Sequence, residues 1–284
     1  MGRFRKGTVS RAWKGAFNLK DRFNRNITYL RISVTDRCNL RCVYCMPEEG
    51  VEPIKHSDLL SFEEITDFVK CAVSMGINKV RLTGGEPLVR KGIVDLVRMI
   101  RETDGVKDLS MTTNAVLLKE FAKPLRDAGL MRLNISLDTV DREKFAAISR
   151  RDLLPDVLEG IDEAVKCGYD KIKLNCVVEK SRNEPNALEV AAYAKENGLE
   201  ARFIRTMDLD GGDFWVVDGG IGGDCSICNR IRLSAMGDVL PCLFSDIGFS
   251  VRKYGACEAI RLAVESKPHK GTLSRSNEFY NVGG

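Results

Sequence analysis

Six of the ten cysteines lie in two groups whose spacing suits metal or iron–sulfur chemistry. The groups are Cys38, Cys42 and Cys45, and Cys225, Cys228 and Cys242. Three thiolates on one short loop can hold three irons of a [4Fe–4S] cluster and leave the fourth iron open to an outside ligand. A structural zinc site needs four ligands, and the first group, C-x3-C-x2-C, has no histidine near it in the sequence. The first group therefore predicts a cluster with one open iron.

The second group has a different spacing, C-x2-C-x13-C, and two arginines, Arg230 and Arg232, lie between its cysteines. One interpretation is a zinc site whose fourth ligand is His269 or Cys257. The other is an auxiliary iron–sulfur cluster with one open iron. The spacing alone leaves both interpretations open.

The other four cysteines stand alone among apolar or helical neighbours, and we expect small buried side chains at Cys71, Cys167, Cys176 and Cys257. With 44% apolar and 30% charged residues, the 284-residue chain has the composition of a globular protein. We find no apolar run of about 18 residues and no signal-peptide core, so we expect a cytoplasmic location and no membrane association. Cysteines in that compartment indicate metal or redox chemistry rather than disulfides.

Short apolar strands alternate with helical stretches from Tyr29 to about Arg205. The expected strands are 29–34, 79–83, 108–113, 131–137, 171–178 and 200–205. The expected helices are 61–74, 91–103, 118–128, 141–149, 155–167 and 185–197, with another near 255–266. Ser61 and Glu64 form a capping box at the first helix. Glycines that can end three of the helices are Gly129, Gly168 and Gly198.

This alternation predicts an α/β fold with a parallel sheet and right-handed crossovers. Six βα units are fewer than the eight of a closed barrel, so we predict an open, partial (β/α)6 barrel of the TIM type. Active-site residues of such barrels lie at the C-terminal ends of the strands, where the first cysteine group follows the first strand.

Composition divides the chain into four segments. Residues 1–20 are basic, and we expect a poorly ordered, solvated tail, with contact to nucleic acid or a membrane surface as the weaker alternative. Residues 21–207 form the barrel. Residues 208–224 are rich in glycine and form a flexible connection or a loop beside the substrate. Residues 225–284 form a C-terminal extension that carries the second cysteine group.

Strand alternation also places cations on the inner face of the barrel. In the strand KVRLT the apolar residues suit the helix layer, so Lys79 and Arg81 point inward. The same alternation turns inward Arg31, Ser33, Asn134, Ser136, Lys173 and Asn175. Cations in an interior that is normally apolar need anionic partners. Glu86 and Asp138 could pair with them, but two acids leave an excess of cations, which favours an anionic substrate such as a polyphosphate.

Two motifs together carry a family resemblance. An aromatic residue, Tyr44, precedes the last cysteine of the first group, and GGEP follows the second expected strand at residues 84–87. Two glycines alone would indicate only a turn. At this distance from the cysteines, however, GGEP and the C-x3-C-x2-C group resemble the signature of the radical S-adenosylmethionine (SAM) superfamily. The resemblance implies that Cys38, Cys42 and Cys45 hold a [4Fe–4S] cluster whose open iron binds SAM. It also implies that an electron from the cluster cleaves SAM to a 5′-deoxyadenosyl radical.

The second group, with the sequence CNRIRL, resembles the C-terminal cluster motif of the GTP 3′,8-cyclase family of molybdenum cofactor biosynthesis, which has the same thirteen-residue gap. Segments similar to that family's follow in its order, from YLRISVTDRCNLRCVYCMP through VRLTGGEPLVR, MTTNA, LNISLD and KLNCVV to RFIRTMD. The chain ends in a similar double glycine, Gly283–Gly284. The resemblance implies a lyase that converts GTP into 3′,8-cyclo-7,8-dihydro-GTP, with a second [4Fe–4S] cluster on Cys225, Cys228 and Cys242.

The same resemblance implies the site residues. Those of the SAM site are Tyr44, Gly84, Gly85, Glu86, Ser136 and Met207. Those that face GTP are Arg31, Lys79, Arg81, Thr112, Lys173, Arg202, Arg230 and Arg232. Guanine would bind the open iron of the second cluster beside the catalytic Arg230 and Arg232, and C3′ of the ribose would lose its hydrogen and bond to C8. A flavodoxin or ferredoxin is implied as the electron donor, and a homodimer is left open.

Two departures from the family pattern define the alternatives. The connection 208–224 is shorter than its counterpart by several tens of residues, and Arg205 stands where the family usually has an acid. An enzyme of the same family with one auxiliary cluster could instead act on a different nucleotide, a peptide or another metabolite. A non-enzymatic iron–sulfur scaffold or zinc-binding interaction protein would leave GGEP unexplained.

Overall fold

The computed structural model describes residues 19–282, and its centre is a curved sheet. Within these residues the sheet has nine strands in the order β6-β5-β4-β3-β2-β1-β7-β8-β9. The strands are β1 Tyr29–Ser33, β2 Lys79–Thr83, β3 Asp108–Thr113, β4 Arg132–Ser136, β5 Lys171–Val178, β6 Glu200–Arg205, β7 Arg230–Leu233, β8 Asp238–Leu240 and β9 Phe249–Ser250. All pairs from β6 to β7 are parallel, whereas β7–β8 and β8–β9 are antiparallel. The tail up to residue 18 and the last two glycines lie outside the described residues.

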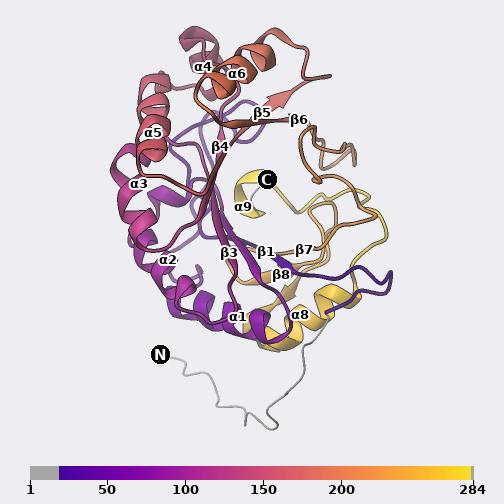
Figure 1. The fold of residues 1–284 in the computed structure, drawn as a ribbon. Coiled ribbons are helices and arrows are strands. Elements are labelled where there is room, and N and C mark those ends of the chain that lie inside the picture. The colour runs from indigo at the N-terminus through magenta and orange to yellow at the C-terminus, as the bar shows by residue number, and fades with distance from the viewer. Residues whose placement is uncertain (1–18, 283–284) are drawn as a thin grey trace.

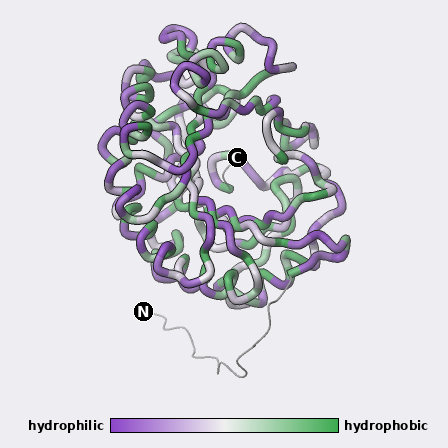
Figure 2. Tube along the Cα trace, viewed as in Figure 1, coloured by the Kyte–Doolittle hydropathy of each residue, from purple (hydrophilic) through white to green (hydrophobic). Residues whose placement is uncertain are grey.

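Helices cover the outer side of the sheet (Figure 1). The helices of the described residues are α1 Phe62–Ser74, α2 Ile93–Arg101, α3 Leu118–Asp127, α4 Arg142–Ser149, α5 Leu154–Lys166, α6 Pro185–Glu196, α7 Val251–Tyr254, α8 Ala256–Glu265 and α9 Phe279–Val282, with a short 3-10 turn at Pro87–Val89. The last helix, α9, lies inside the curve of the sheet. Figure 2 shows hydrophobic and hydrophilic residues alternating along the outer helices, which suits one face on the sheet and the other in water.

The predicted open barrel is confirmed, and its six strands lie where the sequence placed them. Leu30 and Leu82 are completely buried on the helix side, as expected from strand alternation. The capping box of α1 is present, because the Glu64 N–H donates to Ser61 Oγ at 3.1 Å and the Ser61 N–H donates to Glu64 Oε2 at 2.7 Å. The sheet does not close into a barrel, because its two edge strands, β6 and β9, do not pair with each other.

The strands of the C-terminal region were not expected from the sequence. β7 pairs in parallel with β1, and β8 and β9 fold back against it as an antiparallel extension. The second cysteine group therefore flanks β7, and the first group follows β1, the neighbouring strand of the same sheet. The four-residue β7 and three-residue β8 are too short to show a clear alternation of apolar and polar residues.

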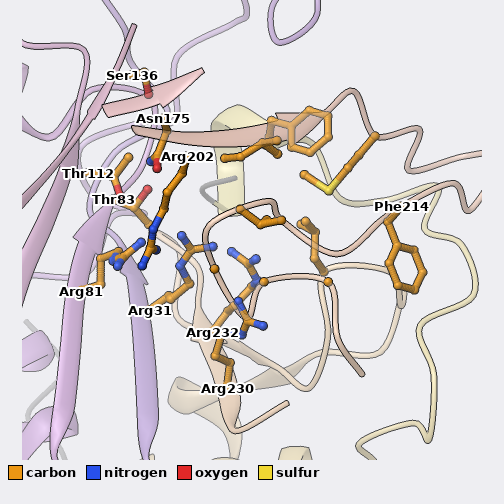
Figure 3. A pocket seen from close by; sticks show the side chains of 18 of the residues that line it. Arg31, Arg81, Thr83, Thr112, Ser136, Asn175, Arg202, Phe214, Arg230 and Arg232 are labelled. Atoms are coloured by element: carbon orange, nitrogen blue, oxygen red, sulfur yellow. The ribbon is translucent and has the colours of Figure 1, made fainter. Parts of the chain in front are cut away.

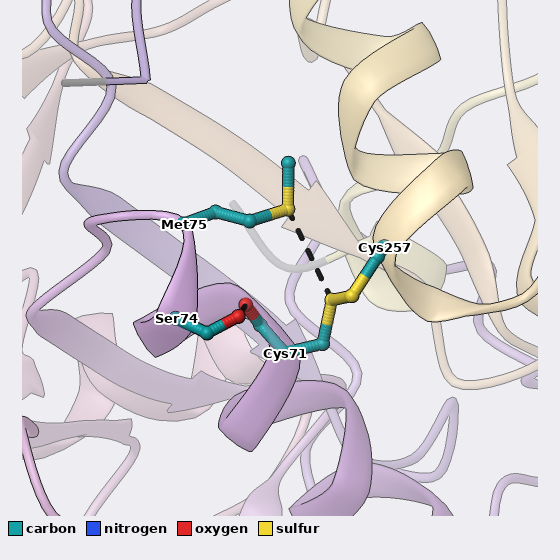
Figure 4. Close-up of a disulfide and its surroundings, with 4 residues drawn as sticks. All are labelled: Cys71, Ser74, Met75 and Cys257. Atoms are coloured by element: carbon teal, nitrogen blue, oxygen red, sulfur yellow. Dashed lines mark hydrogen bonds between the residues drawn. A yellow bond between two sulfur atoms is a disulfide. The ribbon is translucent and has the colours of Figure 1, made fainter. Parts of the chain in front are cut away.

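The prediction for two of the isolated cysteines is wrong. Cys71 of α1 and Cys257 of α8 form a disulfide across the packed helices (Figure 4), although they are 186 residues apart in the sequence. Cys176 is buried as expected, and Cys167 is only partly buried. A pairing of this kind depends on which helices pack together, which local sequence patterns do not show.

No helix within residues 19–282 is long and apolar enough to cross a membrane.

Candidate active site

The loop that carries the first cysteine group is tied to the end of α4. The Arg41 N–H donates to the Ser149 carbonyl at 2.9 Å, so the middle of the loop is held against the last turn of that helix. Arg150 caps the helix in the left-handed conformation, with φ 55°. Its Nη1 donates to the carbonyls of Arg41 at 3.0 Å and Met46 at 3.1 Å, the residues that immediately flank Cys42–Cys45. One side chain thus fixes both ends of the C-x2-C segment.

These three thiols fit an iron–sulfur cluster, because the positive charge of the iron would stabilise their thiolate form. Burial raises the pKa of Cys38 to about 11, and those of Cys42 and Cys45 to about 12, so the bare thiols are protonated at neutral pH. Cys38 Sγ accepts hydrogen bonds from the Leu40 N–H at 3.4 Å and from Asn114 Nδ2 at 3.7 Å. Iron would displace the protons, and the two donors would stabilise a thiolate.

The glycines of GGEP pack directly on the cysteine loop. The Gly85 N–H donates to the Thr35 carbonyl at 2.8 Å, and the Glu86 N–H donates to the Arg37 carbonyl at 2.7 Å. A Cβ on Gly84 or Gly85 would collide with the carbonyl oxygen of Thr35 or Arg37. The second strand and the cysteine loop therefore approach each other at a distance that only glycine permits.

Glu86 is buried and bonded to neutral groups. Its Oε1 accepts from Thr113 Oγ1 at 2.8 Å and the Leu88 N–H at 3.0 Å, and its Oε2 accepts from the Asn114 N–H at 2.6 Å. Burial raises the pKa of this carboxyl to about 7. The side chain joins the GGEP turn to the end of β3 and does not neutralise an inward cation.

The expected internal acids are thus not the partners of the cations. Asp138 accepts from Tyr44 Oη at 2.6 Å and from a backbone N–H of β5 at 2.8 Å. Lys173 pairs instead with Glu200 on the neighbouring strand, at 2.9 Å. The sequence around Glu200 does not predict this ion pair, because the pair depends on the register of β5 and β6.

A row of three arginines crosses β2, β1 and β7. Arg81 and Arg31 are register partners, and so are Arg31 and Arg232. Burial is the main cause that lowers the pKa of Arg31 to about 10 and that of Arg232 to about 9. Arg31 Nε and Arg202 Nε are buried with no hydrogen-bond partner in the described part of the chain. Because the like charges of Arg31 and Arg81 on facing strand positions repel each other, this part of the row indicates a site for an anion.

The second cysteine group faces the same space. Burial opposes ionisation of Cys228, but the charges of Lys267 and Arg230 and hydrogen bonds to Arg230 lower its pKa to about 7. Lys267 is buried, and its Nζ donates to the Arg230 carbonyl at 2.7 Å and the Pro241 carbonyl at 2.8 Å. Burial raises the pKa of Cys242. A cationic surrounding of this kind favours thiolates and suits an anionic cluster.

The zinc interpretation of this group loses support. Cys257 is held in the disulfide with Cys71 on the outer side of the sheet. Between residues 19 and 282, no three His, Cys, Asp or Glu side chains are arranged to bind a single metal ion. The ring of His269 packs edge-on against Phe23, with centroids 5.0 Å apart. The three free thiols then fit a cluster with an open iron better than a tetrahedral zinc site.

A cavity of about 730 Å³ joins all these groups. Every residue that the sequence assigned to a cluster, to SAM or to the substrate lines it, including Thr112, Ser136 and Met207. In Figure 3 the side chains of Arg31, Arg81 and Arg202 gather in one region, with Arg230 and Arg232 beside them. Lining residues that the sequence did not indicate include Tyr29, Asp108, Phe214, Trp215 and Lys267. Tyr29 and Asp108 lie at inward strand positions that alternation could have identified, whereas Phe214, Trp215 and Lys267 have no local signal.

The comparisons with known proteins agree with this geometry. The family model of the Radical SAM superfamily matches residues 32–194. A GTP 3′,8-cyclase of Thermodesulfovibrio yellowstonii is 42% identical over 282 residues, covering 83% of this chain and 87% of that protein. One from Campylobacter fetus subsp. fetus is 38% identical over 323 residues, covering 94% of this chain and 100% of that protein. The second alignment is longer than this 284-residue chain, so the relative contains positions that have no counterpart here.

Solved structures with low identity share the fold. The Streptococcus suis SuiB structure with precursor peptide SuiA has a TM-score of 0.65 at 15% identity, and the match covers 86% of this chain and 66% of that one. The anSMEcpe structure with bound AdoMet has a TM-score of 0.64 at 16% identity, with 86% and 82% covered. This chain spans a little under two thirds of SuiB. At these identities, the likeness establishes the open-barrel architecture and nothing about the substrate.

Proposed function

Since the chain belongs to the radical SAM superfamily and, within it, to the GTP 3′,8-cyclase family, we propose that it is a lyase that converts GTP into 3′,8-cyclo-7,8-dihydro-GTP for molybdenum cofactor biosynthesis. The observation that carries the substrate assignment is the arginine row Arg81–Arg31–Arg232, in the same cavity as both cysteine groups. Within it, Arg31 and Arg81 lie on facing strand positions and repel each other, and a triphosphate supplies several negative charges to offset that repulsion.

The first cysteine group would hold the superfamily's [4Fe–4S] cluster, which supplies the electron that cleaves bound SAM. Cys38, Cys42 and Cys45 are the ligands in this proposal, and Arg150 holds their loop in place. The Gly84–Gly85 turn and Ser136 would contact SAM from the ends of β2 and β4, where parallel barrels place their sites. A flavodoxin or ferredoxin would deliver the electron.

The cations would divide between the two ends of GTP. Lys79, Arg31, Arg81 and Lys173 would bind the triphosphate, since they lie on the inner face of β1, β2 and β5. Arg230 and Arg232 belong to β7, beside the second cysteine group, and would orient the guanosine end. Cys225, Cys228 and Cys242 would hold a second cluster whose open iron receives guanine. The peptide and metabolite alternatives would not need a row of buried arginines.

Equilibrium binding under anaerobic conditions tests this assignment. We expect GTP to bind at least tenfold more tightly than guanosine, because each charged hydrogen bond to phosphate contributes about 1.5–3 kcal/mol. We also expect GTP to bind more tightly than ATP, because only guanine would fit the second site. Equal affinities for GTP and guanosine would contradict the phosphate assignment, and equal affinities for GTP and ATP would contradict the guanine assignment.

A further inference from the structure

The glycine-rich connection spans the open side of the barrel. Asp218 and Phe203 of β6 form an antiparallel bridge, in which the Phe203 N–H donates to the Asp218 carbonyl at 3.1 Å and the Asp218 N–H donates back at 3.0 Å. Three residues further on, the Ile221 carbonyl accepts a hydrogen bond from Arg230 Nη2 of β7, at 3.4 Å. The connection thus contacts both β6 and β7, the first and last strands of the parallel part of the sheet.

An aromatic–cation stack anchors this segment to β6. The Arg205 guanidinium lies over the ring of Trp215, with its Cζ 3.8 Å from the ring centroid. Arg205 Nε also donates to the Glu179 carbonyl at 3.1 Å, which fixes the guanidinium on the barrel side. Arg182 adds a second link, since it lies 3.6 Å from the Asp218 carboxylate and over the ring of Phe203. An acid at position 205 could not form the stack, so the anchor depends on the arginine.

Part of the inner surface of the segment is glycine backbone. Gly219, Gly220 and Gly222 line the cavity, opposite arginines of the proposed substrate site. A Cβ on Gly220 would lie 3.5 Å from the guanidinium carbon of Arg202, and one on Gly222 would lie 3.8 Å from Arg230 Nη1. Any larger side chain on Gly220 would therefore compete with a ligand for the space in front of Arg202.

We propose that residues 213–223 form the wall that encloses the substrate on the open side, and that Arg205 and Trp215 are a positioning pair that holds this wall. The bare backbone of Gly219 and Gly220 leaves Arg202 turned toward the bound anion. This inference rests on the proposed function only for the identity of the substrate, GTP.

Three variants test the wall in different ways. Trp215→Ala removes the stack, and we expect it to raise the KM for GTP about tenfold while kcat falls less than threefold. It should also increase the 5′-deoxyadenosine released per product severalfold, and speed hydrogen–deuterium exchange of 213–223. Trp215→Phe keeps an aromatic face and should restore most of these properties. Gly220→Val adds bulk against Arg202, and should raise the KM without faster exchange.

The matched control is Tyr254→Ala, which removes an exposed ring beneath Lys253, 4.9 Å away, outside the cavity. It should behave as the unaltered protein in every assay. An unchanged KM and unchanged product ratio in Trp215→Ala would overturn the proposal, even if exchange became faster. If the unaltered protein does not turn over GTP, the proposed function fails, and exchange of 213–223 in Trp215→Ala then decides the wall alone: faster exchange supports it and unchanged exchange overturns it.

Discussion

Arg31 of β1 lies directly opposite Arg81 of β2, on the inner face of the sheet. Burial lowers the pKa of both guanidinium groups, which means that the protein holds two charges where water solvates them poorly. Arg31 Nε has no hydrogen-bond partner within residues 19–282. Such an arrangement reduces the stability of the empty protein and is retained where a ligand neutralises it.

Replacing Arg31 by methionine should therefore have opposite effects on stability and on binding. We expect Arg31→Met to raise the free energy of unfolding of the ligand-free protein by about 1 kcal/mol, since it removes a repelling charge. GTP binding should weaken by about 1.5–3 kcal/mol. Urea unfolding with and without GTP measures both. Arg98→Met on the exposed face of α2 is the control and should change neither by more than about 0.5 kcal/mol. Lower stability combined with unchanged GTP affinity would contradict this account.

The two cysteine groups should be separable by mutation. Cys38→Ala should reduce the iron content from about eight to about four per chain and abolish reductive cleavage of SAM. Cys242→Ala should also leave about four irons, but reductive cleavage of SAM should continue without product. Iron analysis and 5′-deoxyadenosine release measure the two properties. An iron content of about four in the unaltered protein, or equal loss of cleavage in both variants, would argue against two clusters with separate roles.

The Cys71–Cys257 disulfide should stabilise the protein by joining the barrel to the C-terminal region. Cys71 and Cys257 link α1 to α8, and a bridge over such a long loop stabilises a protein by about 2–4 kcal/mol. We expect Cys257→Ser to lower the free energy of unfolding by that amount, and a reducing agent to lower it equally in the unaltered protein. The reducing agent should not affect the variant. Mass spectrometry of a non-reduced digest that finds both thiols free would refute the bridge.

Glu86 should make stability depend on pH. Its folded-state pKa of about 7 lies above the ordinary value of 4.5, so the folded protein keeps a proton that the unfolded chain releases. Stability is then highest below pH 4.5 with respect to this group, and is lost as pH rises toward 7, by at most about 3 kcal/mol. Glu86→Gln should abolish this part of the pH dependence. Urea unfolding of cluster-free protein at intervals from pH 5 to 8 tests it, and parallel pH curves for both proteins would speak against it.

The strands of the barrel and the first cysteine site could be predicted because each is specified by a short, contiguous stretch of sequence. The strand KVRLT alternates cleanly, so the inward position of Arg81 followed from the period of two. The GGEP turn and the cysteine loop are contiguous motifs, and the structure brings them into backbone contact.

The residues that escaped prediction depend on contacts between distant segments. Cys71 and Cys257 pair only because α1 packs on α8, and Glu200 meets Lys173 only through the register of β5 and β6. Arg205 was recognised as unusual, but its partner Trp215 could be found only after the connection had been placed against β6. Tertiary packing decides such pairs, and no periodicity in the sequence encodes it.

The most direct test of the central claim is the fate of one hydrogen atom. The protein, with its clusters reconstituted anaerobically, would be supplied with SAM, a reductant and GTP deuterated at C3′, and 5′-deoxyadenosine would be analysed by mass spectrometry. We predict that the deuterium appears in 5′-deoxyadenosine, together with one equivalent of 3′,8-cyclo-7,8-dihydro-GTP. Unlabelled 5′-deoxyadenosine with intact, fully deuterated GTP would contradict the assignment of GTP as the substrate.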